Sequence, residues 1–430
     1  MRAFGTMQPL MRGGALTRRG LMAGVSVSAL AAPSIARAQG QNGVALVIGN
    51  SKYKWEASLP NAKRDATDVA KAFQALGLKT ELVQDVGLAE MSATIDKFKA
   101  AARGAPLAAF YFAGHGATWD KDTYLVPQDS DLSDPGTVSK LIRIEAIKEA
   151  TRGAARRLLV MDNCRNNPAG GWRQVVAGYA AKLDASELAA AILTDPETIV
   201  IYSTASGRIA LDGPPGANSP FASAFLRQLG AGSVELRTLP EKLRRELLIA
   251  TEGRQLIYDF NTLSAPFTVK GNGTAPAIAA PAYDPARLVE LRNAYAFARE
   301  KGLMLPPGLV AIRPPAGAPH AEKVGAFAFS WSQTIKGSRH LEPVVFVVLA
   351  IRGDRAEVAN ASKTYDYYQG SRWTSGVVNV AEDRVSWISS AQTYRLELKW
   401  KDANSGTYSS TIVSGSGFPG ETQPFKRLDG

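Results

Sequence analysis

Short apolar runs alternate with segments of helical spacing between residues 42 and 270. Each run suits a strand that is buried on both faces, and the segments between them have the period of amphipathic helices. This alternation predicts an α/β domain over residues 42–270, with a mainly parallel sheet flanked by helices. The apolar runs are residues 44–48, 107–112, 157–161 and 198–202. The helical patterns are residues 65–76, 91–101, 143–151, 220–229 and 239–250.

The first helical segment has the clearest end. Asp65, Val69, Phe73 and Leu76 recur at helical spacing, and Gly77 follows directly. Glycine readily adopts the left-handed conformation that ends many helices. We expect this helix to stop at Gly77.

The pattern changes after residue 270. Residues 272–281 are rich in Pro, Ala and Gly, residues 283–301 predict one helix, and residues 306–319 form a proline-rich spacer. Residues 271–319 are therefore expected to be a linker with one helix. Residues 320–430 contain short strand-like runs between turn residues, which predict a small antiparallel all-β domain. These runs are residues 344–351, 355–359, 377–380, 394–400 and 407–413, with a hairpin loop at 402–406.

Residues 1–38 are typical of an export signal. They contain five arginines and no acidic residue, an apolar stretch at 21–33 and a small-residue cleavage site at 36–38. Arg18 and Arg19 indicate the twin-arginine type, which bacteria use to export folded proteins. An uncleaved anchor is less favoured, because the stretch is shorter than the ~20 residues that a span needs. We expect a bacterial periplasmic or secreted protein without a stable membrane span after signal removal.

The charge of the chain indicates no nucleic-acid partner. The formal charge of +11 falls to +6 once the five signal arginines are removed. This mild basicity fits a bacterial envelope surface, and no motif that combines basic and aromatic residues indicates nucleic-acid binding.

The single cysteine and one of the three histidines follow apolar runs. Cys164 comes after residues 157–161, and His115 comes after residues 107–112. Ligand sites of open parallel sheets lie outside the carboxyl ends of the strands, so both side chains are expected at one site. A thiol beside an imidazole indicates a Cys/His hydrolase. Taken alone, each has a plainer interpretation, because a lone cysteine is often a small buried apolar residue and a histidine a satisfied core or surface residue.

Several ordered motifs resemble the caspase-like peptidase domain of bacteria, which is related to metacaspases and orthocaspases. The resemblance covers about half of the chain. The separation of 49 positions from His115 to Cys164 also matches the roughly 50 of caspases. The motifs are Val-Ala-Leu-Val-Ile-Gly-Asn at 44–50, Leu-Pro-Asn-Ala-Lys-Arg-Asp-Ala at 59–66, Tyr-Phe-Ala-Gly-His-Gly at 111–116, Asp-Asn-Cys-Arg-Asn-Asn-Pro at 162–168, Tyr-Ser-Thr-Ala at 202–205, Asn-Ser-Pro at 218–220 and Gly-Arg-Gln at 253–255.

The resemblance implies a cysteine endopeptidase in which Cys164 is the nucleophile and His115 the acid-base partner. It places the backbone N–H groups of Gly116 and Cys164 in the oxyanion hole, where donors stabilise the developing charge. It also places Asp65 and Asp162 in the S1 pocket for a substrate with Arg or Lys at P1. Two carboxylates favour such a cation and exclude aspartate.

Both carboxylates also have plainer interpretations. Asp65 would be a favourable acid in the first turn of its helix, and Asp162 would cap the turn after its strand. Ala113 departs from the family pattern, since some metacaspases have serine there, and this removes a polar contact from the pocket wall.

The sequence identifies no certain cofactor. His320 and His340 have no acid or cysteine at ligand spacing, so no metal-binding cluster is indicated. Many metacaspases need calcium, and an acidic loop after His115 is a candidate for calcium as an activator. The loop follows no EF-hand pattern, however, and a solvated acidic loop is the plainer interpretation. Its acids are Asp120, Asp122, Asp129, Asp131 and Asp134.

Two function classes follow. The first is an exported cysteine endopeptidase whose partners are protein or peptide substrates. The second is a catalytically silent caspase-like interaction or scaffold module, and a non-peptidase thiol hydrolase is a weaker third. The presence of both Cys164 and His115 favours the enzyme. The aromatic residues of the β domain offer a binding face for a protein or glycan, but they more often fill a core.

Overall fold

The computed structural model describes most of the chain after the expected export signal. The described residues are 42–119, 122–163, 195–204, 210–230, 232–271, 278, 284–335, 338–364, 370–388, 394–412 and 421–428. The predicted signal at 1–38 therefore lies outside them. Within the described ranges, no helix combines the length and the apolar character needed to cross a membrane.

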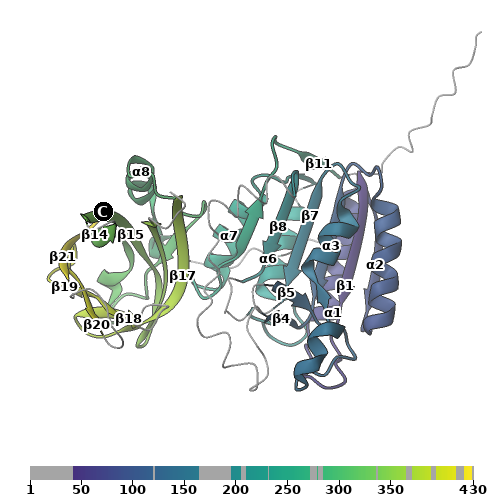
Figure 1. Cartoon of the computed structure of the whole chain (residues 1–430), viewed down its shortest axis with the longest axis horizontal. Coiled ribbons are helices and arrows are strands. Elements are labelled where there is room, and N and C mark those ends of the chain that lie inside the picture. Colours follow the sequence, from purple (N-terminus) through teal and green to yellow (C-terminus); the bar gives the residue numbers. More distant parts are fainter. Residues whose placement is uncertain are drawn as a thin grey trace, which may run out of the picture. The chain divides into compact units, whose positions relative to one another are not determined.

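A six-stranded sheet forms the centre of the α/β domain (Figure 1). The strand order is β10-β8-β7-β3-β1-β2, and only β10 runs antiparallel to its neighbour. The four predicted strands are all present. The edge strands β2 and β10 were not predicted, because neither is an apolar run. The strands are β1 (Gly43–Gly49), β2 (Leu78–Gln84), β3 (Ala108–Ala113), β7 (Arg157–Asp162), β8 (Thr198–Tyr202) and β10 (Tyr258–Asn261).

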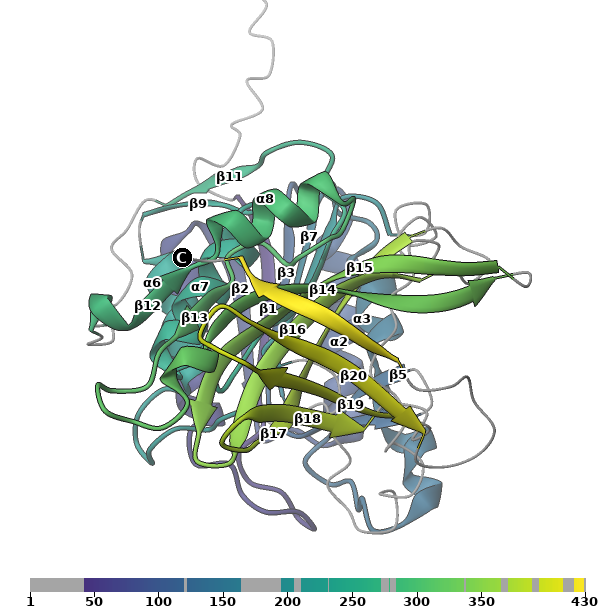
Figure 2. The ribbon, with the colours of Figure 1, turned by 90° about the vertical axis from the view of Figure 1, so that its left-hand side faces the viewer.

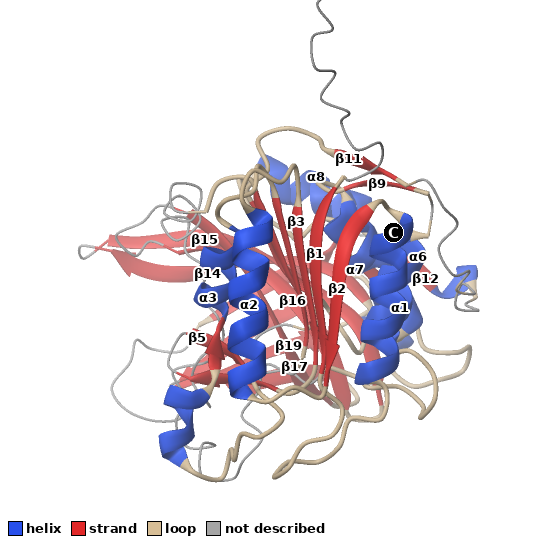
Figure 3. Cartoon of the chain, turned by 90° about the vertical axis from the view of Figure 1, so that its right-hand side faces the viewer, coloured by secondary structure: helices blue, strands red, loops and turns tan. Residues whose placement is uncertain are grey.

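Helices cover both faces of this sheet (Figure 3). On one face lie α1 (Ala62–Ala75), α6 (Pro220–Leu229) and α7 (Leu239–Ala250); on the other lie α2 (Leu88–Ala102) and α3 (Ile144–Thr151). Successive side chains of a strand point to opposite faces. Ala45 and Val47 therefore pack with the first helix layer, whereas Leu46 and Ile48 pack with the second. The predicted mainly parallel sheet with flanking helices is confirmed.

The predicted end of α1 is also confirmed. Gly77 has a φ of 75°, and its N–H donates to the carbonyl oxygen of Gln74 at 2.8 Å. The helix begins at Ala62, earlier than its apolar pattern shows. Asp65 therefore lies within the first helical turn.

Short elements complete the α/β domain. A three-stranded sheet contains β4, β5 and β6, and β9 pairs with β11. The bounds are β4 (Gly116–Trp119), β5 (Asp122–Leu125), the 3-10 helix η1 (Pro135–Lys140), β6 (Ile142–Arg143), β9 (Ser233–Glu235) and β11 (Thr268–Lys270).

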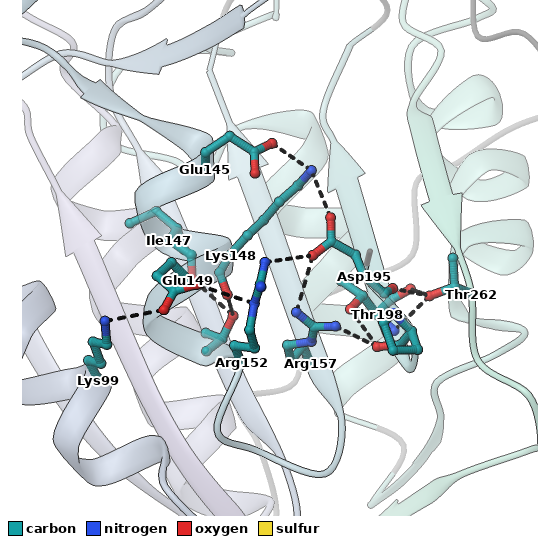
Figure 4. A network of polar contacts seen from close by, with 12 residues as sticks. Lys99, Glu145, Ile147, Lys148, Glu149, Arg152, Arg157, Asp195, Thr198 and Thr262 are labelled. Atoms are coloured by element: carbon teal, nitrogen blue, oxygen red, sulfur yellow. Dashed lines mark hydrogen bonds and ion pairs between the residues drawn. The ribbon is translucent and has the colours of Figure 1, made fainter. Parts of the chain in front are cut away.

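A polar network ties together the amino-terminal ends of β7 and β8 (Figure 4). The Asp195 carboxylate lies 3.2 Å from Lys148 Nζ and 3.4 Å from Arg157 Nη1. Thr262 Oγ1 donates to the Asp195 carbonyl oxygen at 2.7 Å. Since Arg157 and Asp195 are both buried, the network neutralises charges that would otherwise be costly. The network lies at the starts of these strands, at the end of the sheet away from their carboxyl ends, so we interpret it as a stabilising feature of the fold.

The C-terminal part is an antiparallel barrel (Figure 2). Eight strands, β14 to β21, close through the pairing of β15 with β16, and β13 and β12 extend the sheet to ten. Inside it, Phe327, Trp400 and Phe425 form edge-on contacts with centroids 5.0–5.5 Å apart. This confirms the expected core role for Trp400. The barrel strands are β14 (Gly325–Ile335), β15 (Ser338–Arg352), β16 (Arg355–Thr364), β17 (Gly370–Val380), β18 (Arg384–Ile388), β19 (Tyr394–Trp400), β20 (Ser405–Ile412) and β21 (Thr422–Arg427).

Two expectations for this part need correction. Several strands are longer than their apolar runs, because pairing continues through polar residues, as in β16 and β17. The single helix expected over 283–301 is shorter, because Leu288, Val289 and Glu290 pair with β13 instead. The segment consists of η2 (Pro285–Arg287), β12 (Leu288–Glu290) and α8 (Arg292–Glu300), followed by β13 (Val310–Ile312) and η3 (Ala321–Lys323).

Candidate active site

Two strand ends bring the predicted site residues together. In the sheet register, Ala113 at the end of β3 lies beside Asp162 at the end of β7. His115 and Asn163 follow these positions, and the Gly114 N–H donates to the carbonyl oxygen of Asp162 at 3.4 Å. A Cβ added to Gly114 would lie 2.6 Å from Tyr53 Oη and 2.7 Å from the Phe112 ring. Only glycine therefore fits where the chain turns from β3 toward His115.

The imidazole of His115 is held by the loop that follows β1. The ring Nε2 lies 2.7 Å from the carbonyl oxygen of Ala57. The backbone N–H of His115 donates to Tyr53 Oη, also at 2.7 Å. The Tyr53 ring packs against the imidazole with centroids 4.5 Å apart. A carbonyl oxygen only accepts hydrogen bonds, so Nε2 carries a proton in this arrangement.

Asp65 and Asp162 converge on the N-terminus of α6. Ser219 donates its backbone N–H to Asp65 Oδ1 and its hydroxyl to Asp162 Oδ2, both at 3.0 Å. The same hydroxyl accepts from Ala222 N and caps the helix. Tyr111 Oη also donates to Asp162, and Asn218 Nδ2 donates to Asp65. These donors, and the positive end of the helix dipole, hold two carboxylates that are only 2% and 8% exposed.

Burial changes the protonation of this pair. It raises the pKa of Asp65, and the nearby Asp162 carboxylate raises it further. Burial also raises the pKa of Asp162, although hydrogen bonds from serine and tyrosine act in the opposite direction. Among the described residues, no Lys or Arg forms a salt bridge with either carboxylate. Within the part of the chain that the structure describes, the pair therefore shares a buried negative charge with no cation paired to it.

One cleft of about 380 Å³, including space open to solvent, contains these groups. Its lining includes Asp65, Asp162, His115, Asn163, Ser219 and Asp212. Ala113, where some metacaspases have serine, is also in the wall. Asp212 is half-buried on the loop between β8 and α6, and sequence reasoning missed it because a turn rich in Pro and Gly surrounds it. Ser219 was also missed as a site residue, although a serine before Pro220 is a helix-start signal.

The other predicted site residues are placed as follows. Gly116 begins β4, pairs with Leu125 and does not line this cleft. Cys164 lies outside the described residues, but Asn163, to which it is bonded, lines the cleft. The proposed oxyanion role of both residues stays a prediction.

The acidic loop has structural partners within the protein. Asp129 accepts from Leu88 N, Asp131 from Ser133 N and Asp134 from Gly136 N, while Asp122 pairs with Arg143. Asp120 lies outside the described residues. In the part of the chain that the structure covers, no three His, Cys, Asp or Glu residues are grouped to hold a metal ion.

The fold and the cleft define a class, a caspase-like α/β domain with a histidine and a buried acidic pocket at the carboxyl ends of its strands. Comparison with protein families gives the same class, because the model of the caspase domain matches residues 42–267. This match covers just over half of the chain, so the chain belongs to the caspase family of cysteine peptidases.

Individual proteins were compared next. No curated protein matches the chain. Among solved structures, the chain is similar to caspase-1 from Spodoptera frugiperda, with 12% sequence identity and a TM-score of 0.40. That match covers 55% of this chain and 93% of the caspase-1 chain.

Proposed function

We propose that this chain is a cysteine endopeptidase that cleaves peptide bonds after Arg or Lys. The observation that carries the proposal is the pair of buried carboxylates, Asp65 and Asp162, in the same cleft as His115; no Lys or Arg of the described ranges forms an ion pair with either. Keeping two carboxylates out of water without a cation destabilises the empty protein. A P1 guanidinium or ammonium would relieve this cost on binding, whereas a P1 aspartate would increase it.

Cys164 is the proposed nucleophile and His115 the proposed base. Because Nε2 of His115 donates to Ala57, Nδ1 is the nitrogen with a free lone pair. The thiol proton moves to Nδ1, and the thiolate sulfur attacks the carbonyl carbon of the scissile bond. The C–N bond then breaks as the imidazolium protonates the leaving amine, which leaves a thioester. Water, deprotonated by the same imidazole, cleaves the thioester and restores the thiol.

The oxyanion of the tetrahedral intermediate needs donors at the start of this reaction. We assign the backbone N–H groups of Gly116 and Cys164 to that role, as the family resemblance implies. The pocket then selects the residue on the acyl side of the scissile bond, and the remaining substrate extends along the cleft.

Hydrolysis of matched fluorogenic peptides tests the function. Peptides ending in Arg, Lys or Asp are incubated with the mature protein, with and without calcium, and beside Cys164→Ala. We expect the native protein to release the fluorophore from the Arg and Lys peptides, and we expect Cys164→Ala to release none. Cleavage after Asp would overturn the pocket assignment. An absence of turnover under every condition, together with a thiol that does not react with an alkylating probe, would favour the silent interaction module.

We also propose that the protein is exported by a twin-arginine signal and acts in the bacterial periplasm or outside the cell. The support is the sequence of residues 1–38, with Arg18 and Arg19 before the apolar stretch. Replacing both arginines with lysine should leave uncleaved precursor in the cytoplasm. Normal export of that variant would refute the assignment.

A further inference from the structure

Two fully buried amide side chains hold the loop between β8 and α6. Asn61 is 0% exposed and Gln255 is 1% exposed. The Asn61 amide donates to the carbonyl oxygens of Asp212 and Pro214, at 2.7 and 3.0 Å. Its Oδ1 accepts from the N–H of Gly216 at 3.0 Å. Asn61 therefore fixes both ends of a short turn that begins at Asp212.

Gln255 holds the preceding part of the same loop. Its Oε1 accepts from the N–H of Leu211 at 3.1 Å, and its Nε2 donates to the carbonyl oxygen of Ser203 at 2.9 Å. Its own N–H donates to Thr251 Oγ1, which fixes the residue on the end of α7. Both amides spend their hydrogen bonds on backbone groups, so they position the loop and do not contact a ligand. Buried amides that are fully satisfied in this way specify one backbone arrangement.

Three consecutive residues of this loop line the cleft, Ala210, Leu211 and Asp212, and Asp212 is the only one of them with a charged side chain. It lines the cleft together with His115 and Asp162. Burial raises the pKa of Asp212, and the nearby His115 lowers it. Among the described residues, no Lys or Arg forms an ion pair with it. Asp212 is also more exposed than Asp65 and Asp162, so it lies nearer the mouth of the cleft.

We propose that Asp212 is a third carboxylate of the P1 pocket that selects Arg over Lys, and that Asn61 and Gln255 are its positioning residues. This rests on the proposed cleavage after basic residues and adds a preference between the two. It also gives a role to Asn61 of the 59–66 motif and to Gln255 of the 253–255 motif, which the proposed function did not use.

The chemistry of the two side chains explains the preference. A guanidinium has five N–H donors in a rigid plane, and its Nε lies closer to the substrate backbone than the two terminal nitrogens. The terminal nitrogens can contact Asp65 and Asp162 at the base of the pocket while Nε–H faces Asp212 near the mouth. A lysine ammonium is compact and has its three donors at one point. When it contacts the base, it leaves Asp212 without a partner.

Asp212→Asn tests the preference in the full-length mature protein. We expect the ratio of kcat/KM for Arg over Lys peptides to fall about tenfold, mainly through KM for Arg, since one charge-assisted hydrogen bond is lost. Glu90→Gln is the matched control, because it removes one exposed negative charge on α2, outside the cleft. An unchanged ratio would overturn the inference. An equal fall of kcat for both peptides would also overturn it, because Asp212 would then act on His115 and not on the P1 side chain.

A double-mutant cycle tests the positioning role. Asn61→Ala should lower the Arg-over-Lys ratio in the native background but not in the Asp212→Asn background, since residues that act as a unit are not additive. Gln255→Ala should behave in the same way. Additive losses would show that the amides act on general stability. If no variant and no native protein cleaves either peptide, the proposed function fails; active enzyme with an unchanged ratio refutes only this inference.

Discussion

The imidazole of His115 donates to the backbone carbonyl oxygen of Ala57 across 2.7 Å. This contact joins the loop after β1 to the loop after β3, so the orientation of the ring depends on a segment that is distant in sequence. Because a main-chain oxygen cannot donate, the contact also fixes which nitrogen of the imidazole holds the proton. This main-chain contact fits the base proposed above, in which Nδ1 of His115 accepts the thiol proton.

Tyr53, on the same loop as Ala57, also supports this arrangement, since its hydroxyl accepts from the backbone N–H of His115. Tyr53→Phe keeps the ring that packs on the imidazole but leaves a buried N–H without its acceptor. We expect kcat to fall about tenfold, with KM nearly unchanged, because such an orphan donor costs roughly 1–3 kcal/mol. Steady-state kinetics of Tyr53→Phe and the native protein with an Arg peptide measure this change of kcat. Tyr408→Phe, which removes the hydroxyl group of a buried tyrosine in the barrel, is the control. An unchanged kcat in Tyr53→Phe would contradict the role.

The acidic pair predicts that function opposes stability. Asp65 has an ordinary pKa of 3.8 when unfolded and a raised one when folded. At a pH between these two pKa values the folded protein binds more protons than the unfolded protein. The free energy of unfolding therefore falls as the pH rises through this range. Asp65→Asn keeps the acceptor for Ser219 and removes the charge. It should raise the free energy of unfolding by ~1–3 kcal/mol at pH 8 and by almost nothing below pH 3.8.

Denaturant unfolding of Asp65→Asn and the native protein at both pH values measures this. The same variant should lose most of its activity on Arg peptides, because the pocket then has less charge for the guanidinium. A variant that is less stable than the native protein at pH 8 would show that Asp65 has a stabilising partner, contrary to the account.

Ser219 links the pocket to α6, so its removal should affect both. Ser219→Ala deletes the helix cap, which costs about 1 kcal/mol, and the donor to Asp162. Without that donor the pKa of Asp162 rises further, so the acid limb of kcat/KM for Arg peptides should move to higher pH. Ser219→Thr keeps a hydroxyl and should retain most of the native profile. A pH profile of Ser219→Ala that matches the native one would refute the link.

The network around Asp195 predicts a loss of stability without a change of specificity. Asp195→Ala leaves the buried Arg157 guanidinium without its carboxylate, which should cost about 3–5 kcal/mol. Glu149→Ala breaks only exposed ion pairs with Lys99 and Arg152 and should cost less than about 1 kcal/mol. Thermal and denaturant unfolding compare the two variants. The Arg-over-Lys ratio should be the same in both, since the network lies at the strand starts, away from the cleft.

The central strands were predictable from sequence because β1, β3, β7 and β8 are buried on both faces and therefore contain continuous apolar runs, with the polar residues of β7, Arg157 and Asp162, only at its ends. The edge strand β2 was not, because exposed residues such as Lys79 and Glu81 interrupt its pattern. In the barrel, polar residues continue the pairing of β16 with β17, so the apolar runs underestimate strand length.

The site was predictable only in part for a related reason. His115, Asp65 and Asp162 follow strand ends or open a helix, where position in the fold follows from local pattern. Asp212, by contrast, reaches the cleft through hydrogen bonds from Asn61, which is 151 residues away in sequence. No local pattern encodes such a contact, and only the folded chain brings the two together.

The most direct test of the central claim is covalent labelling of the mature protein with peptidyl acyloxymethyl ketones that differ only at P1. Intact mass and peptide mapping then show which residue is modified and by which reagent. The account predicts one adduct, on Cys164, from the Arg reagent, with no adduct in Cys164→Ala and slow labelling in His115→Ala. Two results would contradict the account. One is faster labelling by the Asp reagent than by the Arg reagent, and the other is a folded protein whose Cys164 reacts with neither reagent.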